Sequence, residues 1–375
     1  MAGLYIHVPF CVRRCSYCDF FSGTELKYKE MYLSSLAREL VLRKDYLRGE
    51  PLETVYFGGG TPSLLQAHDF GKLFDVVYRC FPVSGNAEIT LEANPDDMTP
   101  HYVASLRSLP FNRISMGVQS FNDADLRLLN RRHDGRQAIQ AVERCKENGY
   151  TNISIDLMYG LPGQTVQAWD TTLAQALQLD LPHLSAYHLT YEEHTRLYAW
   201  RETGKVNAIG EELSLHLFSA MVERLTGAGY IHYEISNFAK PGCLSRHNSS
   251  YWTGKAYLGA GPSAHSYDID SRQWNVSSLA LYIKGMEDNA PAVEVEVLEN
   301  HTRYNDYVIT RLRTMWGMEL SYVMQTFGQE LYAYCLKQAA PHIRQGLLVL
   351  EGGGLSFSKE GILLSDGIMC DLLWT

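Results

Sequence analysis

The sequence predicts an α/β protein with a parallel sheet and a small additional domain at its C-terminal end. Over the first 190 residues, short runs of β-forming residues alternate with longer amphipathic stretches, a pattern typical of parallel βαβ units. The length of 375 residues is sufficient for two or three domains with a sizeable buried core. From about residue 300 the pattern changes to helices followed by a hairpin.

Six strand–helix units account for the first predicted domain, residues 1–190. The predicted strands are residues 3–8, 54–57, 88–92, 113–118, 153–158 and 184–188. The predicted helices between them are residues 25–47, 63–80, 99–108, 123–129 with 135–148, and 164–179. So many units are typical of a doubly wound sheet or of a barrel, complete or incomplete.

An extension over residues 191–295 follows. It is predicted to be helical up to a short strand at residues 230–234. Residues 236–275 are rich in Gly, Ser, Asn, His and aromatic residues with weak periodicity, which is typical of a functional loop region.

The third predicted domain, residues 296–375, has the order of a winged-helix-like domain. Its predicted elements are helices at 302–315, 321–327 and 329–340, a hairpin of 347–350 with 355–357, and a last helix at 359–373. From residue 300 onward, six basic residues stand against seven acidic ones. Because this balance gives no nucleic-acid footprint, we expect a structural or protein-facing role.

Charge and hydropathy exclude several classes of protein. The 33 basic and 42 acidic residues give a formal charge of −9, which disfavours nonspecific binding to nucleic acid or anionic membranes. No apolar run of about 18 residues predicts a membrane-spanning helix, and the first residues lack the features of a signal peptide. We therefore expect a cytoplasmic protein whose eight cysteines stay reduced, as ligands or buried thiols.

Three cysteines stand together after the first predicted strand, with the spacing Cys11-x3-Cys15-x2-Cys18. Three thiolates on a short loop can bind three irons of a 4Fe–4S cluster and leave the fourth iron open. An open iron can chelate an amine and a carboxylate, such as those in the methionine part of S-adenosylmethionine (SAM). The spacing leaves two alternatives: a zinc site with His7 as the fourth ligand, and a chance grouping.

The segment that begins at Tyr5, Y-I-H-V-P-F-C-x3-C-x2-C, resembles the signature of a radical-SAM family. This family contains the oxygen-independent coproporphyrinogen III dehydrogenases (HemN) and the HemW-type haem chaperones. The resemblance covers nearly the whole chain, through residues 259–265 to the C-terminal domain. It implies a partial (β/α)6 barrel with a 4Fe–4S cluster and SAM at one end, plus a small C-terminal domain.

The segment F-G-G-G-T-P, which contains Gly59, Gly60 and Thr61, follows the second predicted strand. Its glycines allow the backbone to approach a ligand such as SAM closely, although a tight turn is the alternative. Glu92 ends the third predicted strand, where barrel strands face the chemistry. Asp156 lies inside the apolar fifth strand, where an unpaired carboxylate would cost several kcal/mol.

The resemblance adds further SAM contacts. It makes Gln119 and Arg131 SAM-binding residues, although a solvated charge at a helix end is the ordinary role of a lone arginine. Tyr5 and His7 are two residues apart on one strand and therefore face the same side. The resemblance makes Tyr5 a neighbour of SAM, whereas His7 is either a site residue or a hydrogen-bonded core histidine.

Three features favour the haem-chaperone branch. The dehydrogenase pattern continues as Cys-Gly-Cys, but Cys18 is followed by D-F-F. The early position of Cys11 leads us to expect no long N-terminal segment of the dehydrogenase kind. Residues 246–252, R-H-N-S-S-Y-W, resemble the HNxxYW motif of the chaperones. In this motif His247 stands beside two aromatic residues, a combination suited to an iron porphyrin, although a structural histidine is the alternative.

The segment G-A-G-P-S-A-H-S, residues 259–266, is common to both branches and either lines the porphyrin side or forms a structural turn. The resemblance thus implies a chaperone that binds a 4Fe–4S cluster, SAM and haem, and transfers haem to an acceptor protein such as a membrane respiratory enzyme. Flavodoxin or ferredoxin would donate electrons. The alternative function is oxidative decarboxylation of coproporphyrinogen III. The sequence assigns no catalytic residue and leaves open whether SAM is cleaved.

Overall fold

The computed structural model describes residues 2–375, and a twelve-stranded sheet forms its larger part. The strand order is β12-β11-β10-β9-β1-β2-β3-β4-β5-β6-β8-β7. Strands β1 to β6 are all parallel. Within residues 2–375 the edge strands β12 and β7 do not pair with each other, so the sheet is open. This architecture confirms the predicted partial barrel.

The six predicted parallel strands are all present, and most are longer than predicted. They are β1 (Ala2–Val8), β2 (Leu52–Gly59), β3 (Val83–Ala93), β4 (Arg113–Gln119), β5 (Ile153–Tyr159) and β6 (His183–His188). Most of their apolar side chains are buried, as expected for strands in a parallel sheet.

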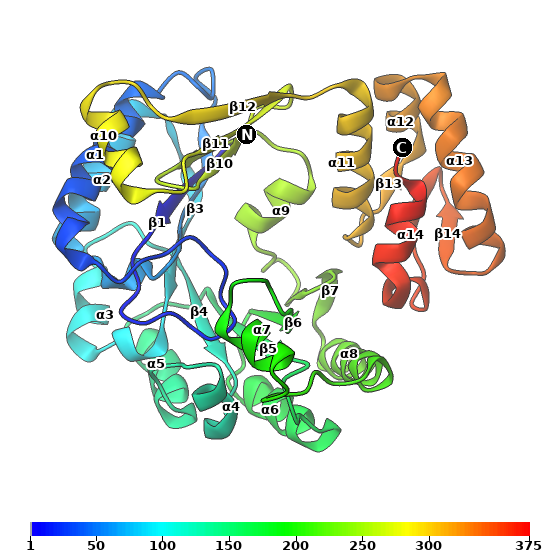
Figure 1. Cartoon of the computed structure of the whole chain (residues 1–375), viewed down its shortest axis with the longest axis horizontal. Helices are drawn as coiled ribbons and strands as arrows, with labels where there is room; N and C mark the ends of the chain where they lie inside the picture. Colours follow the sequence, from blue (N-terminus) through cyan, green and yellow to red (C-terminus); the bar gives the residue numbers. More distant parts are fainter. Residues whose placement is uncertain (1) are drawn as a thin grey trace.

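The helices of the barrel lie on the outer side of the sheet (Figure 1). They are α1 (Lys29–Leu42), α2 (Ala67–Cys80), α3 (Pro100–Leu106), α4 (Asp123–Leu128), α5 (Gly135–Glu147) and α6 (Val166–Gln178). The predicted helix at 25–47 is wrong at both ends. Residues Leu26–Tyr28 form a 3-10 helix, and after Leu42 the chain turns through Arg48 and Gly49, which have positive φ. Helix α2 begins at Ala67, later than predicted, because a capping box of Gln66 and Asp69 fixes its start.

The predicted loop region at 236–275 is wrong, because it contains four strands and a helix. The extension consists of α7 (Arg196–Glu202), α8 (Glu211–Gly227), β7 (Ile231–Glu234), β8 (Asn237–Ala239), α9 (Arg246–Trp252), β9 (Tyr257–Ala260), β10 (His265–Tyr267), β11 (Ser271–Asn275), α10 (Leu279–Glu287) and β12 (Val293–Val297). Strand β9 pairs in parallel with β1 and so brings the extension back to the N-terminal strand. Strands of three to five residues are too short to show a periodicity.

The C-terminal part of the chain has a hydrophobic core of its own, built between Tyr304 and Leu372. Its elements are α11 (Asn300–Leu312), β13 (Met318–Glu319), α12 (Leu320–Phe327), α13 (Gln329–Arg344), β14 (Leu348–Glu351), β15 (Gly354–Phe357) and α14 (Ser365–Leu372), with a small sheet in the order β13-β15-β14. The predicted last helix starts too early, since residues Gly361–Leu364 form a 3-10 turn. A Cβ on Gly361 would lie 1.8 Å from the Leu347 carbonyl oxygen.

Helices α11 to α14 form a separate body beside the barrel, and the chain enters it after β12 (Figure 1). Helix α9 lies between the two parts and contacts α11. Across residues 2–375, none of the helices combines the length and the apolar character that crossing a membrane requires.

Candidate functional site

The cysteine loop follows β1 and is closed by backbone hydrogen bonds. The Cys11 amide donates to the Gly23 carbonyl at 2.9 Å, and the Gly23 amide donates to the Pro9 carbonyl at 2.8 Å. The loop is also attached to the segment after α4, where the Ser16 amide donates to the Leu129 carbonyl at 3.1 Å and the Asn130 side chain donates to a loop carbonyl. These bonds hold the loop at the carboxyl end of the parallel strands.

Every residue predicted to bind the cluster or SAM lines the cavity beside this loop. The cavity has a volume of about 560 Å³. Its lining includes Cys11, Cys15, Cys18, Tyr5, Gly59, Gly60, Thr61, Glu92, Gln119, Arg131 and Asp156. The volume lies in the range of sites that bury a small molecule.

Arg131 links the cysteines to the strand ends. Its Nη1 donates to the Cys15 Sγ at 3.2 Å, and its Nη2 donates to the Asn94 side chain and the Gly117 carbonyl. Within the described residues the buried Nε has no partner. The Thr61 hydroxyl donates to the Cys11 Sγ at 3.4 Å. A buried guanidinium with a free donor at a cysteine-lined cavity fits a ligand that carries a carboxylate.

The three thiols fit a multi-iron group better than one ion. Among residues 2–375 no group of three or more His, Cys, Asp or Glu side chains is arranged to bind a single metal ion. A 4Fe–4S cluster does not require such convergence, because each thiolate binds a different iron. Burial raises the pKa of the Cys18 thiol to about 11, so binding iron would release its proton.

Two buried carboxyls face the cavity with raised pKa values. Burial raises the pKa of Glu92 to about 7, although hydrogen bonds from Tyr56 and Gly59 favour the charged form. The Tyr56 hydroxyl donates to Glu92 Oε1 at 2.6 Å, and the Gly59 amide donates to Oε2 at 3.2 Å. Burial also raises the pKa of Asp156 to about 6, although the hydrogen bond with the Ser185 hydroxyl and the nearby Arg113 charge favour the ionised form. Buried carboxyls with such values are typical of binding sites.

The glycines after β2 are required by the packing of the chain itself. A Cβ on Gly59, whose φ is +103°, would lie 2.6 Å from the His7 ring, and one on Gly60 would lie 2.6 Å from the Phe10 carbonyl oxygen. Gly59 and Gly60 also line the cavity, so their approach to a ligand stays a prediction beside this packing requirement. Gln119 has a φ of +68°, a strained conformation for a residue other than glycine, and such strain is common at ligand sites.

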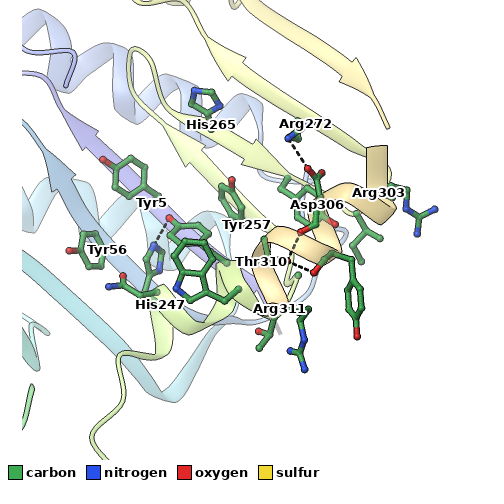
Figure 2. Close-up of a pocket in the computed structure, with 18 of the residues that line it drawn as sticks. Tyr5, Tyr56, His247, Tyr257, His265, Arg272, Arg303, Asp306, Thr310 and Arg311 are labelled. Atoms are coloured by element: carbon green, nitrogen blue, oxygen red, sulfur yellow. Dashed lines mark hydrogen bonds and ion pairs between the residues drawn. The ribbon is translucent and has the colours of Figure 1, made fainter. Parts of the chain in front are cut away.

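A second, larger cavity of about 1090 Å³ adjoins the first and is shown in Figure 2. Its floor is formed by residues of the barrel and of α9, including Tyr56 and His247, and its opposite wall by residues of α11. The two cavities share the lining residues Tyr5, Asp19, Phe20, Glu92 and Tyr187. This arrangement places a ligand of the larger cavity next to the cysteine-side cavity.

His247 lies buried on α9, with both ring nitrogens in hydrogen bonds. Its Nδ1 is 2.7 Å from the Thr54 hydroxyl and its Nε2 is 2.8 Å from the Tyr251 hydroxyl. The ring stacks on Tyr56 with the ring centroids 4.7 Å apart and an interplanar angle of 20°. Burial lowers the pKa of His247 to about 3, so the ring is neutral at physiological pH. The HNxxYW segment therefore forms one face of the larger cavity.

His7 faces the same cavity as Tyr5, as their spacing on β1 predicts. Its Nδ1 is 3.1 Å from the Tyr5 hydroxyl and its Nε2 is 2.8 Å from the Phe21 carbonyl oxygen. Both ring nitrogens of His7 thus have partners, as expected for a hydrogen-bonded core histidine, which is one of its two predicted roles.

Sequence reasoning missed the wall that α11 contributes. Arg303, Tyr307 and Arg311 all line the larger cavity. Their spacing of four residues places them on one face of a helix, and this spacing could have been read from the sequence. The count of charges over the C-terminal domain is balanced, so it did not reveal that Arg303 and Arg311 lie on one face of α11.

Comparison with known proteins identifies the family of the chain. The chain matches the radical SAM superfamily over residues 5–176 and the HemN C-terminal domain over residues 298–364. It is 34% identical to the haem chaperone HemW of Mycobacterium tuberculosis, over 99% of this chain and 94% of that protein. Identity to HemW of Bacillus subtilis is 32%, over 98% of both chains.

A solved structure resembles the whole fold. Coproporphyrinogen III oxidase (HemN) from Escherichia coli, described as a radical SAM enzyme, superimposes with a TM-score of 0.86 at 26% identity. The match covers 99% of this chain and 90% of that one. With its cysteine loop, its open barrel and its C-terminal domain, the chain belongs to the HemN/HemW family of radical SAM proteins.

Proposed function

We propose that this protein is a haem chaperone, which binds a 4Fe–4S cluster and SAM in the cysteine-side cavity and haem in the larger cavity, and transfers the haem to an acceptor protein. The observation that carries the proposal is the pair of adjoining cavities. One contains three cysteines and buried polar groups, and the other is large, aromatic and flanked by arginines. The names of the M. tuberculosis and B. subtilis relatives support the same function.

Different side chains of the cysteine-side cavity would bind different parts of the cluster and of SAM. Cys11, Cys15 and Cys18 would hold three irons, and the cluster with SAM supplies one-electron chemistry when bound. Arg131 has a free buried donor for a carboxylate. Glu92 and Asp156 would accept hydrogen bonds from the amine or the ribose hydroxyls, with Tyr5, Gly59, Gly60, Thr61 and Gln119 completing the cavity wall.

The larger cavity suits a flat, mostly apolar ring with charged side chains. Tyr56, Tyr251, Trp252 and Tyr257 contribute aromatic surface, which packs well against a macrocycle. The volume exceeds the roughly 300–1,000 Å³ of common small-molecule sites and so admits a ligand of porphyrin size. We place His247 in the wall of this haem site.

The test is haem binding by the anaerobically reconstituted full-length protein. Titration with haem, followed by its Soret absorbance, is expected to saturate at one haem per chain. Incubation with SAM, a reductant and coproporphyrinogen III is expected to leave the porphyrinogen unchanged by mass spectrometry. Failure to bind haem would overturn the proposal.

The alternative function is that of a coproporphyrinogen III oxidase, and the E. coli HemN superposition favours it. Against it, Cys18 is followed by Asp19 and not by the Gly-Cys of the dehydrogenase pattern. Loss of two CO2 from coproporphyrinogen III in the same incubation would establish the alternative.

We further propose a cytoplasmic setting, because thiolates that bind iron need a reducing compartment and all eight cysteines are free. The haem acceptor would be a respiratory enzyme at the membrane, and flavodoxin or ferredoxin would reduce the cluster. Haem transfer from the loaded protein to an apo-enzyme in isolated membranes would test this acceptor class.

A further inference from the structure

A third, small cavity lies among strands β2 to β6 and adjoins the two large cavities. It has a volume of about 50 Å³, and its wall consists of residues with polar side chains, four of them serines. Glu92 and Tyr187 line all three cavities, and Asp156 lines the small cavity and the cysteine-side cavity. A water molecule requires roughly 10–15 Å³ of such space and two to four polar partners. The small cavity is therefore suited to water and is too small for a larger ligand.

Arg113 begins β4 and lines the small cavity. Its side chain is one of the largest in the buried core, with an exposed fraction of 2%. Its Nη1 donates to the Asn152 side-chain oxygen at 2.6 Å. Across residues 2–375 no carboxylate lies within ion-pair distance of the Arg113 guanidinium. A buried cation loses much of its hydration, so it requires compensation by charges or dipoles nearby.

Asp156 faces the same small cavity from the neighbouring strand β5. Strands β4 and β5 pair in parallel, with Gly117 opposite Asp156. Alternate residues of a strand point to the same side, so Arg113 and Gly117 both face the interior of the barrel. Because the cavity has room for only a few water molecules, the Arg113 guanidinium and the Asp156 carboxyl lie close to each other on its wall.

We infer that Arg113 is a positioning residue whose charge acts across the small cavity on Asp156, which in turn accepts hydrogen bonds from bound SAM. This inference rests on the proposed function, because it assumes that SAM occupies the cysteine-side cavity. An ionised carboxylate accepts stronger hydrogen bonds than a protonated one does. Arg113 lies at the amino end of β4, away from the strand ends that carry the cysteine loop, so it can stabilise the charge of Asp156 without competing for the ligand.

The charges around Asp156 agree with this role. Burial raises the pKa of Asp156 to about 6, whereas the charge of Arg113 and, to a smaller degree, that of Arg131 favour the ionised form. The other titratable groups that share the small cavity with Asp156 are Tyr56 on β2, Glu92 on β3, and His183 and Tyr187 on β6.

His183 adds no positive charge to this cavity. Burial and the nearby Arg113 lower its pKa well below the usual value, so the ring is neutral at physiological pH. Its Nδ1 lies 2.7 Å from the Ser154 hydroxyl and its Nε2 lies 2.7 Å from the Tyr233 hydroxyl. Within the described part of the chain, Arg113 is therefore the one cation on the wall of the small cavity.

The experiment is a double-mutant cycle between Arg113 and Asp156 in the full-length reconstituted protein, with SAM binding measured by isothermal titration calorimetry. Arg113→Met keeps much of the side-chain bulk and removes the charge. At pH 6.5 we expect it to weaken SAM binding by about three- to twentyfold, because the pKa of Asp156 rises and more of the carboxyl is protonated. In the Asp156→Asn background the same change should cost less than about twofold.

Two comparisons separate this effect of charge from a structural one. At pH 9 the affinity of Arg113→Met should return to that of the wild type, because Asp156 is ionised in both proteins. Arg113→Lys keeps the charge and should retain most of the affinity at pH 6.5. The exposed Arg107→Met at the end of α3 is the matched control and should bind SAM like the wild type.

A second variant leaves the buried arginine in place, in case Arg113→Met does not fold by circular dichroism. Asn152→Asp offers a carboxylate to Arg113 at the position of the present 2.6 Å hydrogen bond. The new carboxylate should neutralise the guanidinium and so weaken SAM binding at pH 6.5. This loss, too, should vanish at pH 9 and in the Asp156→Asn background.

A loss of affinity that is equal with and without Asp156→Asn, or that persists at pH 9, would assign Arg113 a purely structural role and overturn the inference. Unchanged affinity in both Arg113→Met and Asn152→Asp would also overturn it. A reconstituted wild-type protein that binds no SAM would instead overturn the proposed function, and the inference with it.

Discussion

Glu92 is one of the residues that line both cavities. Its carboxyl accepts hydrogen bonds from Tyr56 and Gly59, and burial holds its pKa near 7. The group is therefore ionised above pH 7 and progressively protonated below it. An ionised carboxylate accepts stronger hydrogen bonds from an amine or a hydroxyl than a protonated one does.

We predict that Glu92→Gln weakens SAM binding to the reconstituted protein by about 10- to 100-fold, as expected for a hydrogen bond to a charged group. In the wild type, SAM affinity should fall as the pH is lowered from 8 to 6, because Glu92 becomes protonated. The variant should lack this dependence. Isothermal titration calorimetry at both pH values provides the measurement. The exposed Glu287→Gln is the matched control and should behave like the wild type; an unchanged affinity in Glu92→Gln would contradict the prediction.

The position of the SAM-side residues was predictable because parallel strands present their carboxyl ends on one edge. Glu92 is the last residue but one of β3 and Gln119 is the last of β4, and both line the same cavity. The hydrogen bond between His247 and Thr54 was not predictable. It joins α9 to a residue that is 193 positions away in sequence. A partner so distant leaves no local pattern.

Among the helices, two glycines differ in the space that a side chain would have at their positions. Gly71 lies within α2, and a Cβ there would meet no atom within 4 Å. Gly135 begins α5, and a Cβ there would lie 2.1 Å from the Phe121 carbonyl oxygen. The first glycine only weakens its helix, whereas the second permits a close contact of the backbone.

We therefore expect Gly71→Ala to raise the free energy of unfolding by about 0.5–1 kcal/mol, because alanine loses less backbone entropy in a helix. Gly135→Ala should lower it by about 1–3 kcal/mol, the usual cost of overpacking. Urea denaturation of the apoprotein, followed by circular dichroism, gives both values. Both variants replace a glycine with an alanine, so each serves as the control for the other. Equal changes in the free energy of unfolding would show that the space around the glycines does not decide stability.

Long elements were predicted more accurately than short ones. All six parallel strands were found because each contains β-forming apolar residues that the sheet buries. The strands β8 to β11 have three to five residues and were missed. Strand β8 pairs with β6 and β7, whereas β9 pairs with β1 and β10. Such pairing depends on contacts across the sheet, and these contacts leave no period in the sequence.

At the scale of the whole molecule, the larger cavity exists only because the C-terminal part packs beside the barrel. Arg303 and Arg311 project from α11 at this boundary (Figure 2). Within the described residues no carboxylate lies within ion-pair distance of the Arg303 guanidinium, and Arg311 donates only to the Gly317 carbonyl. Two guanidinium groups without acidic partners suit the propionate side chains of haem.

We predict that the double substitution Arg303→Ala with Arg311→Ala weakens haem binding by about tenfold or more. Each hydrogen bond to a charged group contributes roughly 1.5–3 kcal/mol at most, and solvent and salt at the rim of the cavity reduce this contribution. The loss should be smaller at high salt. Equilibrium titration at two salt concentrations measures it, with the exposed Arg344→Ala as control. Identical affinities for the double variant and the control would rule out a role for these arginines.

The wall shared by the two cavities also has a thermodynamic consequence. Tyr5, Glu92 and Tyr187 line both cavities, so ligands bound in the two cavities would contact the same side chains. Any change that SAM makes in haem affinity must be matched by an equal change that haem makes in SAM affinity. The haem transfer that we propose requires an affinity that changes between two states, and the wall shared by the two cavities is where such a coupling would arise.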